Sequence, residues 1–129
     1  IAEPGVEELT STVRHNNEDQ MIGRIVAYLE ERVDSKVTLT DIGETLYVSI
    51  SKLKAIFKKH TGFTIMEYFM KMKIDKAKIL IREEPNNFTE IAALLGFSSV
   101  HHFSKSFKKE TGMSPSEYAK SIKGRIQSA

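Results

Sequence analysis

The sequence predicts an all-α fold, and two observations lead to this. Apolar residues recur three and four positions apart over most of the 129 residues, which is the spacing of one face of a helix. No segment alternates apolar and polar residues convincingly, as a half-buried strand would. Glycines and capping residues of the Ser, Thr and Asn type separate the periodic runs. We therefore expect a series of short helices joined by tight corners.

The composition is that of an ordinary globular chain, with 40% hydrophobic and 28% charged residues. The absence of cysteine excludes disulfides, thiolate metal sites and a cysteine nucleophile. No apolar run approaches the roughly 18 residues of a membrane span, and the start does not resemble a signal peptide. We therefore expect a cytoplasmic protein without a membrane partner. Because the sequence starts at Ile1 rather than at methionine, we interpret it as a piece of something longer.

Charge is distributed unevenly along the chain. Residues 1–36 carry four Lys or Arg against eight Asp or Glu, whereas residues 37–129 carry fifteen against nine. The excess of basic residues in 37–129 favours a nucleic-acid partner for that part of the chain. On charge alone, an ordinary solvated surface would explain the excess equally well.

The first half of the chain predicts four elements. Residues 1–20 are interpreted as a leader or linker from a missing N-terminal domain, with a short helix near 7–13. A helix over 21–33 has one apolar face, and Thr38 with Asp41 forms a capping box for a helix over 39–46. Ser49 begins a helix that ends at Gly62 and buries an apolar face comprising Ile50, Leu53, Ile56 and Phe57.

A long helix over 65–82 follows, with Thr64 and Glu67 as its capping box and Pro85 beyond its end. Its apolar residues spread over more than one stripe, so we expect it to contact two lobes. We place the first lobe at 21–63, the linker helix at 64–82 and the second lobe at 86–123 of a domain over 21–129.

The second half predicts the same plan again. Asn87 with Glu90 caps a helix over 88–95, and Gly96 and Phe97 form a corner. Ser98 or Ser99 then caps a helix that ends at Gly112. Ser114, Pro115 and Glu117 have the pattern of a helix start for the last element.

The two halves repeat each other. LTDIGETL matches FTEIAALL at a spacing of 49 residues, and FKKHTG followed by EY matches FKKETG followed by EY at a spacing of 50. The second corner is thus one residue longer than the first. Each copy has the helix-turn-helix plan, in which the second helix lies in the major groove of DNA.

A helical wheel gives each second helix an outward face rich in hydrogen-bond donors. Opposite the buried face lie Ser51, Ala55 and Lys58 with Lys54 beside them, and in the second copy His101, Lys105 and Lys108 with Ser104 beside them. Lysine can donate to guanine, and further lysines neutralise phosphates. At the edge of these faces, Lys59 and Lys109 suit phosphates better than bases.

The motif IAALLGFSSVHHFSKSFKKETGMSPSEY, within about 21–123, resembles the signature of the DNA-binding domain of AraC/XylS bacterial transcription regulators. The resemblance implies seven helices and two helix-turn-helix lobes joined by a long central helix. It also implies double-stranded DNA, RNA polymerase and an N-terminal sensing or dimerisation domain as partners. By position it implies base contacts from Ser51, Lys54, Ala55, Val100, His101, Ser104 and Lys105. Phosphate contacts are expected from Ser49, Lys58, Lys59, Ser98, Ser99, Lys108 and Lys109.

The chain departs from this family at three positions. Tyr47 stands where the first lobe usually has its turn glycine, in a corner that can require a positive φ. Ala55 offers only a methyl group where family members often present a long polar side chain. Val100 replaces a frequently polar residue and is either core or a methyl contact.

Other functions are less well supported by the residues. His101 and His102 point about 100° apart on a helix and have no ligand four residues on, so we expect no metal and no cofactor. No pairing of nucleophile and base predicts an enzyme. A helical protein-interaction module remains the alternative, and individual lysines could be solvated surface.

Overall fold

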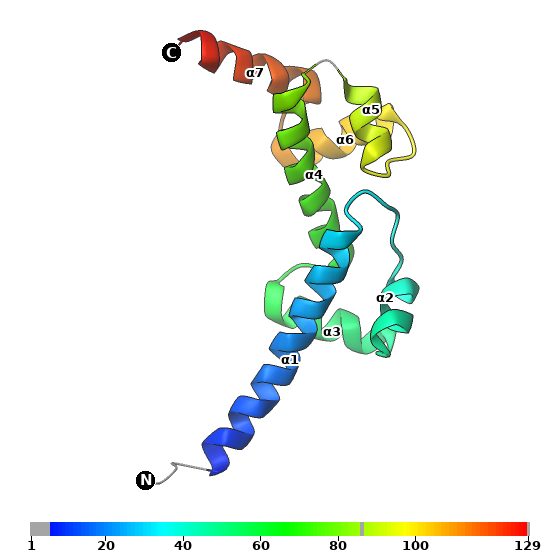
Figure 1. Ribbon diagram of the computed structural model, residues 1–129, viewed down its shortest axis with the longest axis vertical. Helices are drawn as coiled ribbons and strands as arrows, with labels where there is room; N and C mark the ends of the chain where they lie inside the picture. The colour runs from blue at the N-terminus through cyan, green and yellow to red at the C-terminus, as the bar shows by residue number, and fades with distance from the viewer. Residues whose placement is uncertain (1–5, 86, 129) are drawn as a thin grey trace. The chain divides into compact units, whose positions relative to one another are not determined.

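The computed structural model describes the backbone of residues 6–85 and 87–128, and side chains within 17–85 and 87–123 (Figure 1). Over these residues the chain forms seven helices and no strand, which confirms the all-α prediction. The helices are α1 (Val6–Glu31), α2 (Leu39–Leu46), α3 (Ile50–Thr61), α4 (Ile65–Glu83), α5 (Phe88–Leu94), α6 (Val100–Thr111) and α7 (Pro115–Ser128).

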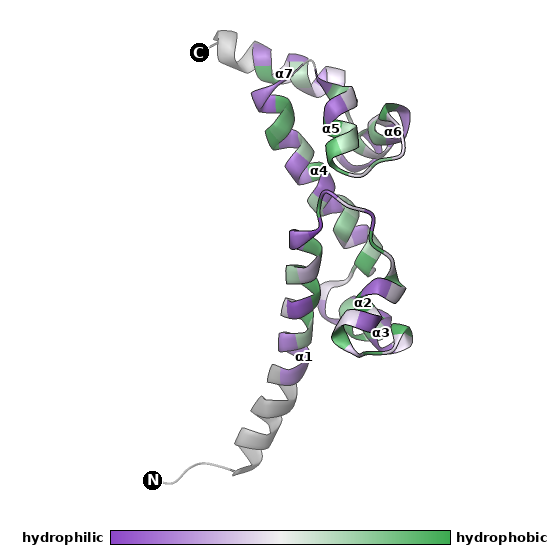
Figure 2. Cartoon of the chain, turned by 45° about the vertical axis from the view of Figure 1, so that its right-hand side comes forward, coloured by the Kyte–Doolittle hydropathy of each residue, from purple (hydrophilic) through white to green (hydrophobic). Residues whose placement is uncertain are grey.

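The first helix differs from the prediction. We expected a helix beginning at Met21 behind a separate short one, but α1 is continuous from Val6. Residues 6–20 contain no proline or glycine, so the local sequence provides no helix stop. Where side chains are described, hydrophobic residues lie along one side of α1 and hydrophilic residues along the other (Figure 2). The interpretation of residues 1–20 as a leader stays a prediction.

Contacts between residues divide the chain into two compact units. Unit 1 comprises Ile1–Glu30 and Val37–Ile65, and unit 2 comprises Glu31–Lys36 and Met66–Ala129. Most of the loop between α1 and α2 therefore belongs to unit 2, together with nearly all of α4.

The core of unit 1 draws on all three of its helices. Fully buried side chains come from α1, α2 and α3, namely Ile25, Leu29, Ile42, Leu53 and Phe57. Ile50 was predicted to be buried, but it is 39% exposed. As the first residue of α3, it has no preceding turn of that helix beside it.

The core of unit 2 is built around aromatic rings. Ring centroids of Phe97 and Phe103 lie 5.3 Å apart, those of Phe103 and Phe107 5.8 Å, and those of Phe107 and Tyr118 5.5 Å. All three pairs are tilted, an arrangement that aromatic rings favour over flat stacking. Aliphatic residues of α4, of α5 and of the position directly after α5 complete the cluster, among them Ile74, Ile81 and Leu95.

Lys73 of α4 is a charged residue buried inside unit 2, with 6% of its surface exposed. Its ammonium donates to the carbonyl oxygens of Val33 and Ser35 at 2.8 Å each, and to that of Leu95. It also lies 4.5 Å from the centroid of the Phe69 ring. Burial lowers the pKa of Lys73 to about 8, and the nearby Asp34 carboxylate opposes this shift. One side chain thus holds the α1–α2 loop and the end of α5 together.

The Lys73 pKa predicts a pH-dependent stability. The folded protein releases this proton near pH 8, whereas the unfolded chain keeps it up to about 10.5, so the free energy of unfolding should rise with pH in that window. We expect the free energy of unfolding of the wild type, minus that of Lys73→Met, to increase by about 1 to 3 kcal/mol from pH 8 to 10.5. Urea unfolding followed by circular dichroism measures it. A difference that stays constant with pH would contradict the assignment.

Candidate nucleic-acid interface

Capping hydrogen bonds define where α2 and α3 begin. Thr38 and Asp41 form the predicted capping box: the Asp41 N–H donates to Thr38 Oγ1 at 3.1 Å, and the Thr38 N–H donates to Asp41 Oδ2 at 3.0 Å. The bond from the Thr38 N–H holds the pKa of the Asp41 carboxyl below its usual value. At the next helix, Ser49 Oγ accepts from the Lys52 N–H at 3.3 Å and caps α3.

The corner between α2 and α3 is unusually tight. Tyr47 ends α2 in the left-handed conformation, with φ 58° and ψ 45°. The N–H of Val48 then donates to the carbonyl oxygen of Gly43 at 3.0 Å. A Cβ added at Gly43 would lie 2.8 Å from the carbonyl oxygen of Val48. The short corner therefore leaves room only for glycine at this position of α2.

The corresponding corner in unit 2 uses different residues. Gly96 has φ 79°, and a Cβ there would lie 3.1 Å from the carbonyl carbon of Ser35. Ser99, rather than Ser98, caps α6 by accepting from the His102 N–H at 3.0 Å. Ala92, which is buried, stands where unit 1 has Gly43, so the second copy accommodates a Cβ at this position of the helix.

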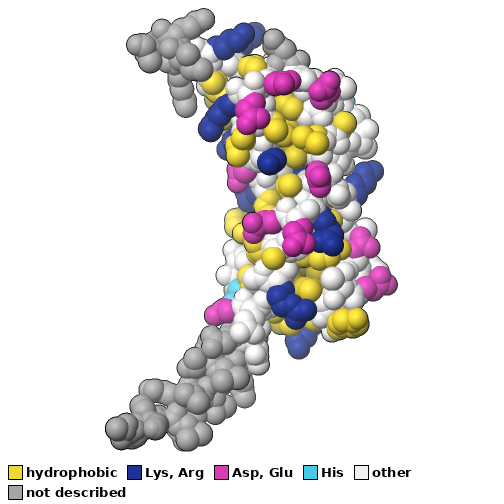
Figure 3. All heavy atoms as spheres, in the orientation of Figure 1, with side chains coloured by type: hydrophobic (Ala, Val, Ile, Leu, Met, Phe, Trp, Pro, Cys, Tyr) yellow, Lys and Arg dark blue, Asp and Glu magenta, His cyan; other side chains and the backbone are white. Residues whose placement is uncertain are grey.

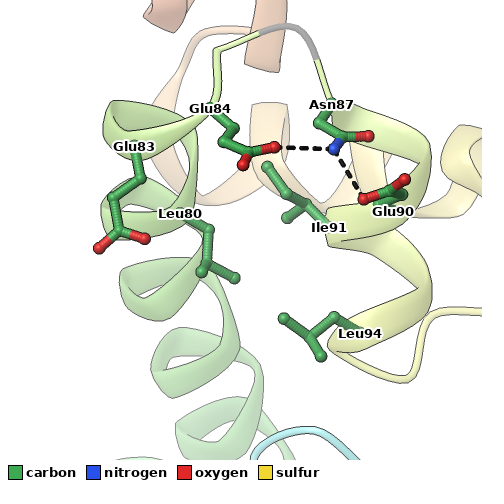
Figure 4. Close-up of a pocket in the computed structure, with 7 residues that line it drawn as sticks. All are labelled: Leu80, Glu83, Glu84, Asn87, Glu90, Ile91 and Leu94. Carbon is green, nitrogen blue, oxygen red and sulfur yellow. Dashed lines mark hydrogen bonds between the residues drawn. The ribbon is translucent and has the colours of Figure 1, made fainter.

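Asn87 does not form the predicted capping box. Its side chain makes no capping hydrogen bond to the backbone of α5. The amide nitrogen instead donates to Glu84 Oε2 at 2.9 Å and to Glu90 Oε2 at 2.7 Å (Figure 4). With the amide nitrogen held between two carboxylates, the side chain joins the end of α4 to the start of α5. At α7 the predicted box does form, between Ser114 and Glu117.

Both second helices bury one face and expose the other, as the wheel predicts. In α3 Leu53, Ile56 and Phe57 are buried, and in α6 Phe103 and Phe107 are buried. The predicted base-facing residues Ser51, Lys54, Ala55, Val100, His101 and Lys105 are exposed, while Ser104 is half-buried. Val100 was left open between core and surface, and it is 38% exposed.

The predicted phosphate-facing residues are all exposed, but the side chains of four of them already have partners, including Ser98, whose Oγ lies 3.3 Å from His102 Nδ1. Ser49 and Ser99 serve as helix caps. Lys59 Nζ lies 3.7 Å from Glu18 Oε1 of α1, while 71% of the lysine side chain stays exposed. The remaining lysines, Lys58, Lys108 and Lys109, form no recorded ion pair within the described parts of the chain.

Two contacts near these faces were not predicted. His60 Nε2 lies 2.8 Å from Glu18 Oε1, and this contact, helped by Lys59, holds the pKa of the Glu18 carboxyl below its usual value. In unit 2, His102 packs edge-on against Phe97 and lies 3.3 Å from Ser98 Oγ. Glu18 lies 42 positions from His60, so the sequence pattern carries no signal for their pairing.

Acidic residues gather on a different part of unit 2. A hollow of about 260 Å³ between α4 and α5 is lined by Leu80, Ile91 and Leu94, with Glu83, Glu84 and Glu90 around them (Figure 4). On the face in Figure 3, hydrophobic side chains over α4 and α5 are bordered by Asp and Glu. Phosphates would be repelled there, so α6 is the better candidate for contact with a polyanion.

Within the described residues, no group of three His, Asp or Glu side chains is arranged to hold a metal ion. None of the helices in that part of the chain has the combination of length and hydropathy that a membrane span requires.

The sequence matches a known family model, and the fold is similar to that of a solved structure. A family model described as a helix-turn-helix domain matches residues 42–121, which include both corners. The C-terminal domain of AraT, a response regulator from Geobacillus stearothermophilus, has a solved structure with 28% identity and a TM-score of 0.75. The similarity covers 78% of this chain and 84% of that one. The fold and both corners are thus those of a helix-turn-helix protein.

Relatives by sequence are regulators of transcription. The probable transcriptional regulator LumQ of Photobacterium leiognathi is 33% identical over 91 residues, 70% of this chain and 37% of LumQ. The HTH-type transcriptional activator RhaS of Salmonella schwarzengrund is 33% identical over 99 residues, 77% of this chain and 36% of RhaS. The chain therefore belongs to the AraC/XylS family of helix-turn-helix proteins, and it spans little more than a third of the length of these curated relatives.

The crowding at Gly43 predicts opposite effects for two helical glycines. Gly43→Ala should destabilise the fold by about 1 to 3 kcal/mol, because the new methyl group would meet the Val48 carbonyl. Gly23→Ala in α1 has open space and should stabilise it by about 0.5 to 1 kcal/mol. Urea unfolding of both variants measures this. Equal effects of the two substitutions would show that the corner does not require glycine.

Proposed function

We propose that the chain binds double-stranded DNA sequence-specifically and regulates transcription, with α3 and α6 each reading one major-groove segment. One observation carries this: the same position in both copies has a helix with a buried apolar face and an exposed face of donors. Lysine, serine and histidine donors on such a face fit guanine acceptors and phosphate oxygens. That LumQ and RhaS are regulators supports the same role.

The roles of individual residues follow from their place on each helix. Lys54 and Ser51 would read bases in the first lobe, and Ala55 would place its methyl group against a thymine. His101, Ser104 and Lys105 would read bases in the second lobe, with Val100 as an apolar contact. Phosphate contacts would come from residues at the helix starts and edges, namely Ser49, Lys58, Lys59, Ser98, Ser99, Lys108 and Lys109.

The proposed regulator acts by binding rather than by catalysis. Because phosphate contacts release counterions, its affinity for DNA should fall steeply with salt concentration. An N-terminal sensing or dimerisation domain and RNA polymerase are the further partners that membership of the family suggests. Their involvement would turn binding at an operator into control of transcription.

A second function has one observation in its favour. The acid-bordered hollow between α4 and α5 includes Leu94, which is 52% exposed. Such a surface suits a protein-interaction module. If that were the chain's main role, binding to duplex DNA would be weak and without base preference.

The roles of α6 lysines are separable by mutation. Lys105→Ala should lose base preference in one half-site, with affinity for the selected site falling by about 5- to 100-fold. Lys109→Ala should weaken all duplexes equally and reduce the salt slope by about one. Fluorescence anisotropy with the selected duplex and a scrambled duplex, over several salt concentrations, measures both.

The control is Lys76→Ala, which removes an exposed lysine of α4 that lies on neither predicted face. It should leave the base preference unchanged. The assignment of Lys105 fails if Lys105→Ala keeps the wild-type preference for the selected duplex over the scrambled one.

A further inference from the structure

Tyr47 is a large aromatic residue that the fold leaves almost entirely in solvent. The residue is 93% exposed, the highest value among the exposed large hydrophobic residues described. Within the described residues it is also the one non-glycine with a positive φ. Its backbone N–H bonds to the Gly43 carbonyl, but the phenol ring and hydroxyl have no partner in the described structure.

Stability alone does not explain a tyrosine at this position. The left-handed conformation is costly for a residue with a Cβ, and glycine adopts it without that cost. Unit 2 uses Gly96 in its own corner, where a side chain would meet the backbone of Ser35. At Tyr47 there is space for a side chain, but the side chain makes no contact that would offset the strain. A function outside the fold is therefore the better explanation.

The position of Tyr47 indicates what that function is. It lies two residues before Ser49, the cap of α3, and four before Ser51, the first predicted base-facing residue. In a helix-turn-helix the first helix crosses the DNA backbone and the start of the second reaches base edges, so we expect the corner between them to lie beside the backbone. Tyrosine hydroxyls are common donors to phosphate oxygens.

We propose that Tyr47 is a DNA contact of the first lobe, with its phenol O–H donating a hydrogen bond to a backbone phosphate beside the groove that α3 reads. This inference rests on the proposed DNA binding. Tyr47 thereby compensates for the short side chain of Ala55 and for the pairing of Lys59 with Glu18. Because the phenol is neutral, the contact adds affinity without adding to the salt dependence.

Three substitutions of Tyr47 test the proposal. Tyr47→Gly relieves the strained φ and should raise the melting temperature by about 4 °C. It should also weaken binding to selected and scrambled duplexes alike by about five- to tenfold, at an unchanged salt slope. Tyr47→Asn tolerates the same backbone conformation and should lose the same affinity. Because asparagine is less flexible than glycine, an equal loss in both variants would come from the missing contact and not from a more flexible corner. Tyr47→Phe keeps the ring and should still lose most of that affinity, at unchanged melting temperature.

The outcomes separate this proposal from the proposed function. If the Gly and Asn variants bind as tightly as wild type, Tyr47 is not a DNA contact, although DNA binding stands. Wild-type affinity in Tyr47→Phe would refute the hydroxyl contact. A wild-type protein that fails to bind duplex DNA in the same assay would overturn the proposed function, and the Tyr47 contact with it.

Discussion

The start of each second helix depends on a corner where the backbone leaves no room for a side chain. In unit 1 the carbonyl oxygen of Val48 lies over Gly43, and in unit 2 the backbone of Ser35 lies against Gly96. These contacts fix where α3 and α6 begin, and hence which residues their exposed faces present. The required glycine lies within the helix in the first copy, at Gly43, and in the turn in the second copy, at Gly96. The second corner is one residue longer, and a different position there must be glycine.

The two lobes therefore repeat each other in sequence, but different contacts hold their corners. The second corner is held by Lys73, whose buried ammonium binds carbonyl oxygens of Val33, Ser35 and Leu95. No buried cation holds the described residues of the first corner, and its turn residue is an exposed tyrosine. At the far end of α3, Glu18 sits against Lys59 and His60. Within the described residues, three lysines of α3 (Lys52, Lys54 and Lys58) and three of α6 (Lys105, Lys108 and Lys109) form no ion pair, so the difference between the lobes lies in their corners.

Much of the fold could be predicted from local signals. Apolar spacing and capping residues placed α2 and α4 to within one residue, and the repeat indicated both corners. Glycine at 62 and 112 marked helix ends in the left-handed conformation. Contacts between distant residues could not be predicted, because nothing local distinguishes Lys73 from the exposed lysines around it. The continuous α1 was missed because residues 6–20 are mostly polar and weakly periodic, although they contain no proline or glycine that would stop a helix. Asn87 was misassigned because its amide nitrogen donates to Glu84 and Glu90, and its side chain forms no capping bond to the backbone of α5.

The central claim is that both second helices read bases, and selection from a pool of randomised duplexes tests it most directly. The proposed function predicts enriched sequences with two separate specified segments, one for each helix. Because Ala55 offers only a methyl group, the segment read by α3 should be the less strictly specified of the two. A single specified segment, or enrichment without any base preference, would contradict the claim.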